Sequence, residues 1–205
     1  DVPTTFSDYL IGHIGSKVAQ KIETNIWEGV NANAGEMDGL AVKIAADAAL
    51  PAAQEIAAVA GGVNAANVIA EMGKVVDAMP SAVYGKEDLH LYVSQNVYKA
   101  YVRALGGFAA AGLGANGYEG RGTNQSLGDV FFDGVKVFVA QGLGANKMVA
   151  AQKSNLMFGT SLLSANQEVR LIDMADIDGS NNFRFVMSFF QGVQYGIIED
   201  IVLYA

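Results

Sequence analysis

The feature that most constrains the fold is a run of apolar residues, spaced four apart, near the start of the chain. Six of them recur in this way: Phe6, Leu10, Ile14, Val18, Ile22 and Ile26. Because four residues make slightly more than one helical turn, this spacing keeps all six side chains in one stripe along a helix. Gly29 stands where a glycine commonly ends a helix. The sequence therefore predicts one long helix from Phe6 to Trp27.

Two shorter helices and a strand are predicted in the next part of the chain. Asn64 can cap a helix and Pro80 can end it, and the residues between them carry apolar side chains at spacings of three and four. A third helix is predicted to begin at Ser94 and to carry Val97, Tyr98, Tyr101, Val102 and Leu105. The segment 89–93 alternates between apolar and polar side chains, which predicts a strand.

The last third of the chain is typical of β structure. The predicted strands are Val135–Ala140, Lys147–Gln152, Glu168–Met174, Phe183–Phe190 and Val193–Tyr204. Between the first two, Gly142 to Asn146 is interpreted as a hairpin connection. Helices come first and strands follow, so we expect an α+β fold in which the strands after Glu168 pack against the long helix.

Glycine dominates the segment from Gly106 to Gly128, which we interpret as a long loop. Within it, Gly112 to Gly117 spells GxGxxG, the pattern of a dinucleotide-binding turn. Such a turn follows a strand and opens a helix, whereas here a helix comes before it and more glycine follows. The segment is therefore interpreted as a flexible loop, although a small-molecule or nucleotide-binding domain stays open as an alternative of another class.

No residue pattern predicts catalysis, a cofactor or a metal ion. The chain has no cysteine and two histidines, and it lacks the G-x-S-x-G turn of a serine nucleophile. Asp173, Asp176 and Asp178 resemble a calcium loop, but the spacing does not fit one. Counted from Asp176, Gly179 is fourth where a calcium loop has glycine sixth, and the twelfth residue is Met187 where the loop has glutamate. We therefore expect a protein that is not an enzyme and that has no cofactor.

Charge and hydropathy exclude two further classes of partner. Thirteen basic residues against 21 acidic ones give a net charge of -8, and the basic residues form no run. Proteins that bind DNA through its phosphate backbone need clustered Lys and Arg, so nucleic-acid binding is not expected. The longest apolar stretches, such as Ala48 to Val63, contain Pro51 and polar residues, and none predicts a membrane span.

Several stretches resemble the major capsid protein family of tailed bacteriophages. They are I-E-T-N-I-W-E-G (22–29), G-E-M-D-G-L (35–40), L-H-L-Y-V-S-Q-N-V-Y-K-A-Y (89–101) and E-V-R-L-I-D-M (168–174). The most specific match is G-V-K-V-F-V-A-Q-G-L-G-A-N-K-M-V-A-A-Q-K-S-N-L-M-F-G-T (134–160). Together these stretches follow the order of segments in that family over nearly the whole chain.

The resemblance implies a spine helix of a peripheral domain at 1–30, an axial domain at 31–150 and strands completing both domains at 151–205. It also implies a virion subunit, made in the bacterial cytoplasm, that assembles with copies of itself into hexamers and pentamers of an icosahedral shell. Packaged DNA would be enclosed without specific binding. Loop residues Tyr118, Arg121 and Asn124 are then expected to lie near the axis of the capsomer.

Family members carry an N-terminal arm and an extended loop before the spine helix, whereas this sequence begins at that helix. The resemblance therefore implies a trimmed subunit that folds but assembles poorly, as monomers or small rings. A bacterial nanocompartment shell protein, which has a similar fold and encloses enzymes, is the alternative within the same fold.

Overall fold

The computed structural model describes residues 4–105, 130–160, 169–174, 177, 179, 182–187 and 190–205. The helices in these residues are α1 (Thr4–Glu28), α2 (Leu40–Ala46), α3 (Val68–Asp77) and α4 (Gln95–Ala104). The first strands are β1 (Glu55–Ile56), β2 (Leu89–Val93), β3 (Val130–Phe132), β4 (Val135–Val139) and β5 (Met148–Gln152). The later strands are β6 (Leu156–Thr160), β7 (Val169–Asp173), β8 (Phe183–Met187), β9 (Gln191–Tyr195) and β10 (Val202–Tyr204).

A six-stranded sheet in the order β1-β10-β5-β2-β4-β3 forms the body of the molecule. Strand β2 lies inside it, parallel to β4 and antiparallel to β5. The last strand, β10, lies between β1 and β5, so the C-terminal residues complete the sheet that begins with Glu55. The sheet therefore joins the C-terminal residues to a segment from the first third of the chain.

Both faces of this sheet are covered, which follows from the burial of successive side chains. In β10, Val202 and Tyr204 belong to one buried cluster and Leu203 belongs to another. Since neighbouring side chains of a strand point to opposite faces, the two clusters are two cores on either side of the sheet. Helices α3 and α4 supply the first core, whereas α2 and the end of α1 supply the second.

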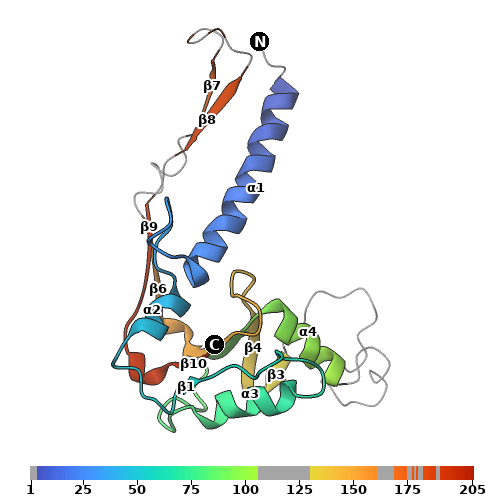
Figure 1. The fold of residues 1–205 in the computed structure, drawn as a ribbon, viewed down its shortest axis with the longest axis vertical. Helices are drawn as coiled ribbons and strands as arrows, with labels where there is room; N and C mark the ends of the chain where they lie inside the picture. The colour runs from blue at the N-terminus through green and yellow to red at the C-terminus, as the bar shows by residue number, and fades with distance from the viewer. Residues whose placement is uncertain are drawn as a thin grey trace.

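Two shorter antiparallel pairs, β6 with β9 and β7 with β8, lie outside the main sheet. Figure 1 shows that the β7–β8 hairpin and α1 extend away from the body of the molecule on the same side. We call strands β6, β7, β8 and β9 the β arm. The molecule therefore consists of a packed body and an extended part made of α1 and the β arm.

Most elements with a local sequence signal are confirmed. The long helix is α1, and the strand at 89–93 is β2. The helix predicted from Ser94 is α4, for which Ser94 is the N-cap residue. The helix predicted after Asn64 is α3, but it begins at Val68 because Asn64 holds a turn by accepting hydrogen bonds from the N–H groups of Asn67 and Val68.

The predicted hairpin at Gly142 to Asn146 is wrong. Strands β4 and β5 do not pair with each other, because β2 lies between them and pairs with both. The segment therefore passes over the end of β2. Its sequence has the residues of a turn, but the position of a distant strand, β2, decides whether the two strands that the turn connects are neighbours in the sheet.

The single strand predicted at Val193–Tyr204 is also wrong. The segment is divided into β9 and β10 by a 3₁₀ turn at Ile198–Asp200. The two strands belong to different sheets. The chain leaves the β arm at Gly196, whose N–H donates to the backbone carbonyl of Asn155, and enters the main sheet at Val202.

Among the described residues, the buried contacts of the late strands with the long helix lie at one end of that helix. Trp27, in the last turn of α1, shares a buried cluster with Val193, Ile201 and Leu203. The described side chains of α1 from Tyr9 to Thr24 include none that is buried. The late strands, which we expected to pack against the long helix, thus contact it at its C-terminal end.

The fold class is α+β, as the order of the predicted elements indicates. The division into three parts at residues 30 and 150 stays a prediction. The predicted loop from Gly106 to Gly128, with its GxGxxG pattern, lies outside the described residues.

Candidate functional site

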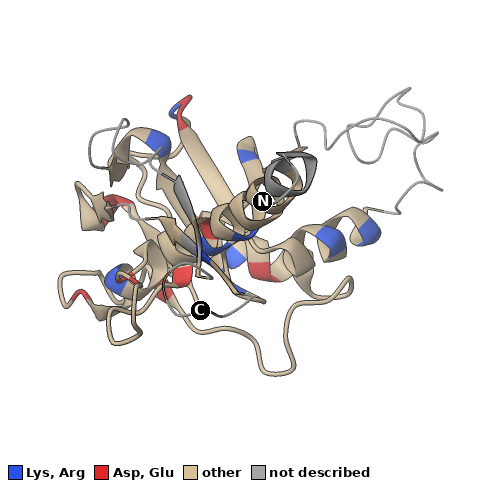
Figure 2. Cartoon of the chain, turned by 90° about the horizontal axis from the view of Figure 1, so that it is seen from above, with Lys and Arg blue, Asp and Glu red and all other residues tan. Residues whose placement is uncertain are grey.

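Residues with the chemistry of a catalytic centre are dispersed over the molecule. Among the residues that the structure describes, no group of three or more His, Cys, Asp or Glu side chains could hold a metal ion. Asp176 and Asp178 lie outside that part of the chain, as do Tyr118, Arg121 and Asn124. Figure 2 shows basic and acidic residues scattered over several elements, and some of them form ion pairs, such as Lys74 with Glu71 and Lys147 with Glu28. The candidate sites are therefore a buried polar network, the base of α1 and an apolar surface.

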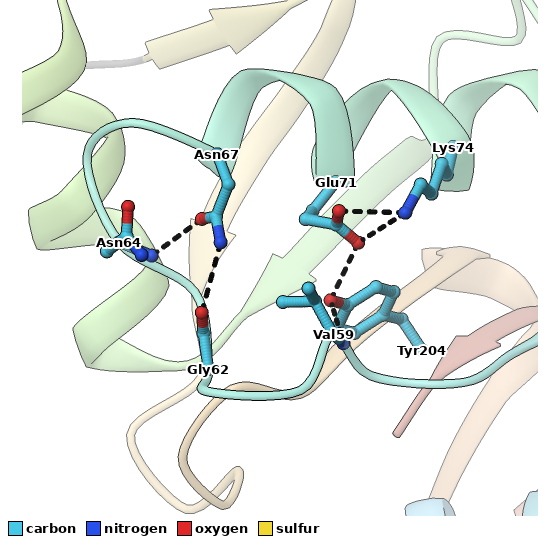
Figure 3. A network of polar contacts seen from close by, with 7 residues as sticks. All are labelled: Val59, Gly62, Asn64, Asn67, Glu71, Lys74 and Tyr204. Carbon is cyan, nitrogen blue, oxygen red and sulfur yellow. Dashed lines mark hydrogen bonds and ion pairs between the residues drawn. The ribbon is translucent and has the colours of Figure 1, made fainter.

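Glu71 is a buried carboxylate that faces the last strand of the sheet (Figure 3). The hydroxyl of Tyr204, itself fully buried, donates to Glu71 Oε2 at 2.9 Å and accepts from the Val59 N–H at 2.9 Å. Lys74 Nζ donates to both Glu71 oxygens at 2.8 and 2.9 Å. Every group of this network has a partner, so we interpret it as a structural tie between α3 and β10.

The hydrogen bonds decide the charge of Glu71. Burial alone would raise the pKa of its carboxyl, but the hydrogen bonds from Lys74 and Tyr204 hold the pKa below its usual value. Glu71 is thus ionised at neutral pH inside the fold. The sequence carries a signal for it, since an acidic residue interrupts the apolar stripe of α3 three residues after Val68 and four before Val75.

The end of α1 is held by the segment that connects β4 with β5. Glu28 accepts a hydrogen bond from Lys147 Nζ at 2.7 Å and one from the Gly144 N–H at 3.2 Å. Directly before Gly144 in this segment, Leu143 is buried in the same cluster as Trp27. These contacts join residues more than one hundred positions apart, so no local sequence pattern predicts them.

A second contact at the base of α1 closes the loop that follows the helix. Glu36 pairs with Lys21 of α1, and it also accepts hydrogen bonds from Asn33 Nδ2 at 3.0 Å and the Val30 N–H at 3.2 Å. Lys21, Asn33 and the Val30 amide, in that order, lower the pKa of Glu36 to about 2. The ionised carboxylate therefore holds the loop against α1.

We predict that the contacts of Glu36 are present above about pH 4.5 and are lost as the pH falls towards 2, because a lowered pKa favours the folded contacts only while the group is ionised. The pKa of Glu36, measured by an NMR titration of side-chain carboxyl shifts, should be about 2. Lys21→Met should raise it towards the ordinary value. Lys17→Met is the matched control, since Lys17 donates to Gln20 instead. An unchanged Glu36 titration in Lys21→Met would contradict the prediction.

Helix α2 fixes the inner end of the β arm. Lys43 Nζ donates to the Val193 carbonyl at 2.7 Å, and the Tyr195 hydroxyl donates to Asp47 Oδ2 at 2.6 Å. Burial and the Asp47 carboxylate raise the pKa of Tyr195 to about 12. The Asn155 side chain adds three more hydrogen bonds, one from its amide to the Ile197 carbonyl and two from the Gly196 and Ile197 N–H groups to its oxygen. The inner end of β9 is thus anchored in the body.

The β arm and the residue just before β9 expose large apolar side chains, which we call the arm surface. These side chains are Met157, Phe158, Phe183, Val186 and Phe190, between 41% and 75% exposed. Met157 and Phe158 are neighbours in β6, so they point to opposite faces, yet each is 49% exposed. About half of each side chain is therefore accessible, although Val193, which pairs with Phe158 and points to the same face, is buried against the body.

A two-stranded pair that leaves large apolar side chains half exposed on both faces is an unusual element for an isolated chain. Two antiparallel strands alone are only marginally stable in water, and they gain stability from a third strand or a covering surface. Contiguous exposed apolar patches on proteins commonly mark contacts with other molecules. The arm surface is therefore the strongest candidate for a protein contact among the described residues.

No model of a known protein family matches the sequence, and no curated protein matches it. One similar solved structure is a chain of "Satellite phage P4 procapsid including size determination (Sid) protein", with a TM-score of 0.59 at 10% sequence identity. The likeness covers 97% of this chain and 66% of that chain. This chain thus has the fold of a phage procapsid chain and spans 66% of its length.

A second structure, titled "Mycobacterium phage Che8", has a TM-score of 0.47 at 12% sequence identity. The likeness covers 74% of this chain and 53% of that chain.

Within the described part of the molecule, no helix has the length and apolar character needed to cross a lipid bilayer.

Proposed function

We propose that this chain is a structural subunit of a tailed-phage or prophage capsid. Its role is to assemble with copies of itself into the hexamers and pentamers of an icosahedral shell that encloses DNA in the virion. The observation that carries the proposal is the fold shared with a satellite phage P4 procapsid chain over 97% of this chain. Since a fold alone does not determine function, the surface of the molecule has to agree with it.

Two properties of the surface support this role. The arm surface offers exposed apolar side chains at the outer part of the molecule, where a neighbouring subunit can cover them. The net charge of -8, without a basic run, suits a wall that encloses DNA and does not bind it. A chain with the same fold that encloses enzymes would need a surface for its cargo, and no described feature favours that role.

The proposal predicts reversible association through the arm surface. Sedimentation velocity on the purified chain, from about 1 to 100 µM, should show rings or smaller oligomers that grow with concentration. Phe158→Asp should weaken this association at least about tenfold, because burying a phenylalanine contributes about 2 kcal/mol and burying an unpaired carboxylate opposes it. The measured quantity is the concentration at which half the chains are associated.

The matched control is Ile69→Asp on α3. Ile69 and Phe158 are both 49% exposed, but Ile69 lies outside the β arm. This control should associate like the parent chain. A parent chain that stays monomeric over the whole concentration range would contradict the proposed function, and equal effects of the two substitutions would contradict the role of the arm surface.

A further inference from the structure

Among the described side chains of α1, which begin at Tyr9, burial is found only in the last turn. The first buried side chain of the helix in the described part is that of Asn25, so the helix from Tyr9 to Thr24 has no residue fixed in a core. At 1.5 Å per residue the 25-residue helix is about 37 Å long. The described contacts that fix the direction of α1 therefore act on its last two turns.

Three glycines make backbone contacts there that no other residue could make. A Cβ atom added to Gly142 would lie 2.0 Å from the Glu23 carbonyl oxygen, and one added to Gly39 would lie 2.5 Å from the Trp27 carbonyl oxygen. A Cβ atom on Gly29 would lie 2.3 Å from the Met37 carbonyl oxygen. We call Gly29, Gly39 and Gly142 the glycine socket.

The socket encloses the end of α1 from two separate segments. Gly39 belongs to the loop that follows α1, and its N–H donates to the Gly29 carbonyl at 2.9 Å. Gly142 belongs to the connection between β4 and β5, which is continuous with the main sheet. The ion pair of Glu28 with Lys147 adds a contact on the same connection, and it opposes rotation of α1 about its own axis.

We infer that the glycine socket sets the angle between α1 and the six-stranded sheet. A side chain at position 142 would push the connection away from Glu23, and the rigid helix would transmit the displacement along its length. A tilt of about 10° at the socket moves Tyr9, about 24 Å from Asn25 along the axis, by about 4 Å. If the chain is a capsid subunit, as proposed above, the same angle would set the shape of the subunit within the shell. This consequence rests on the proposed function.

Pulsed electron resonance between two spin labels tests the inference on the chain in dilute solution. The sequence contains no cysteine, so Tyr9→Cys on α1 and Lys99→Cys on α4, both exposed, provide the only attachment points. We expect a single narrow distance distribution in the labelled parent chain. Gly142→Ala should shift its centre by about 4 Å or broaden it by a similar amount.

Gly15→Ala is the matched control, because a Cβ atom at Gly15 meets no atom within 4 Å; its distribution should equal that of the parent chain. Circular dichroism establishes whether each variant is folded. If Gly142→Ala does not fold, Glu28→Gln, which removes the charge paired with Lys147, decides the question by a broader distribution. A parent-like distribution in the folded Gly142→Ala chain, or in Glu28→Gln where that variant decides, would overturn the inference.

This measurement separates the inference from the proposed function. Distances are recorded at concentrations where the chain is monomeric, so they report the socket whether or not the chain associates. If α1 is displaced in Gly142→Ala and the chain never associates, the inference about the glycine socket holds and the proposed capsid role is contradicted. If α1 is not displaced and the chain does associate, the inference is contradicted and the proposed capsid role is unaffected.

Discussion

Replacing Trp27 with alanine should lower the free energy of unfolding by about 3–5 kcal/mol, the range for deleting a large aromatic side chain from a core. Trp27 is 5% exposed, and its ring centroid lies 5.2 Å from that of Tyr92 in β2. It is the residue through which α1 enters the core that α2 and the sheet share. Its removal leaves a cavity where three elements meet.

The measurement is urea denaturation followed by circular dichroism, since Trp27 is the only tryptophan and its fluorescence is lost with it. Tyr9→Ala is the matched control: Tyr9 is an aromatic residue of the same helix but is 69% exposed. Its substitution should change the free energy of unfolding by no more than about 0.5 kcal/mol. A loss below about 1 kcal/mol for Trp27→Ala would show that α1 is not anchored through this residue.

The sequence predicts those elements whose signal lies within one segment. The four-residue apolar spacing before Trp27 defines α1, and Ser94 marks the start of α4 because its position before an amphipathic run is a local property. The alternation at 89–93 defines β2 but predicts only one buried face. The structure buries Tyr92 as well, because α2 and Trp27 cover the second face of the sheet.

Elements that depend on distant pairing could not be predicted. The two-residue strand β1 exists only because it pairs with β10, almost 150 residues later. Helix α2 lies in an alanine-rich stretch without clear periodicity, and it is defined by its contacts with α1 and the sheet. The separation of β9 from β10 likewise depends on which sheet each strand joins.

The candidate sites also differ in whether a local sequence pattern could predict them. Glu71 could be recognised as an acid inside an apolar stripe, whereas its partner Tyr204 is 133 residues away and carries no local signal. The arm surface could not be inferred from apolar residues in predicted strands, since such residues are usually buried in a sheet. Its exposure follows from the pairing of β6 with β9 outside the main sheet.

The second substitution with a large expected effect on stability lies in the buried network around Glu71. Tyr204→Phe should lower the free energy of unfolding by about 1–3 kcal/mol at pH 7, because it leaves the Val59 N–H without its acceptor and removes a donor from the Glu71 carboxylate. Tyr101→Phe is the matched control. It removes a hydrogen bond of 3.0 Å from a buried tyrosine to the Phe131 carbonyl, a group that does not titrate.

The effect of low pH on the free energy of unfolding should distinguish Tyr204→Phe from Tyr101→Phe. The pKa of Glu71 in the folded chain is lowered, so the stabilisation from its ionised form is present above the ordinary value near 4.5 and is lost as the pH falls below it. Without the Tyr204 hydroxyl the folded-state pKa should rise, and this contribution should shrink. The difference between the parent chain and Tyr204→Phe should therefore be smaller at about pH 3 than at pH 7, whereas that for Tyr101→Phe should stay constant. Denaturation curves at the two pH values decide it, and a Tyr204→Phe difference independent of pH would show that the hydroxyl does not stabilise the charge of Glu71.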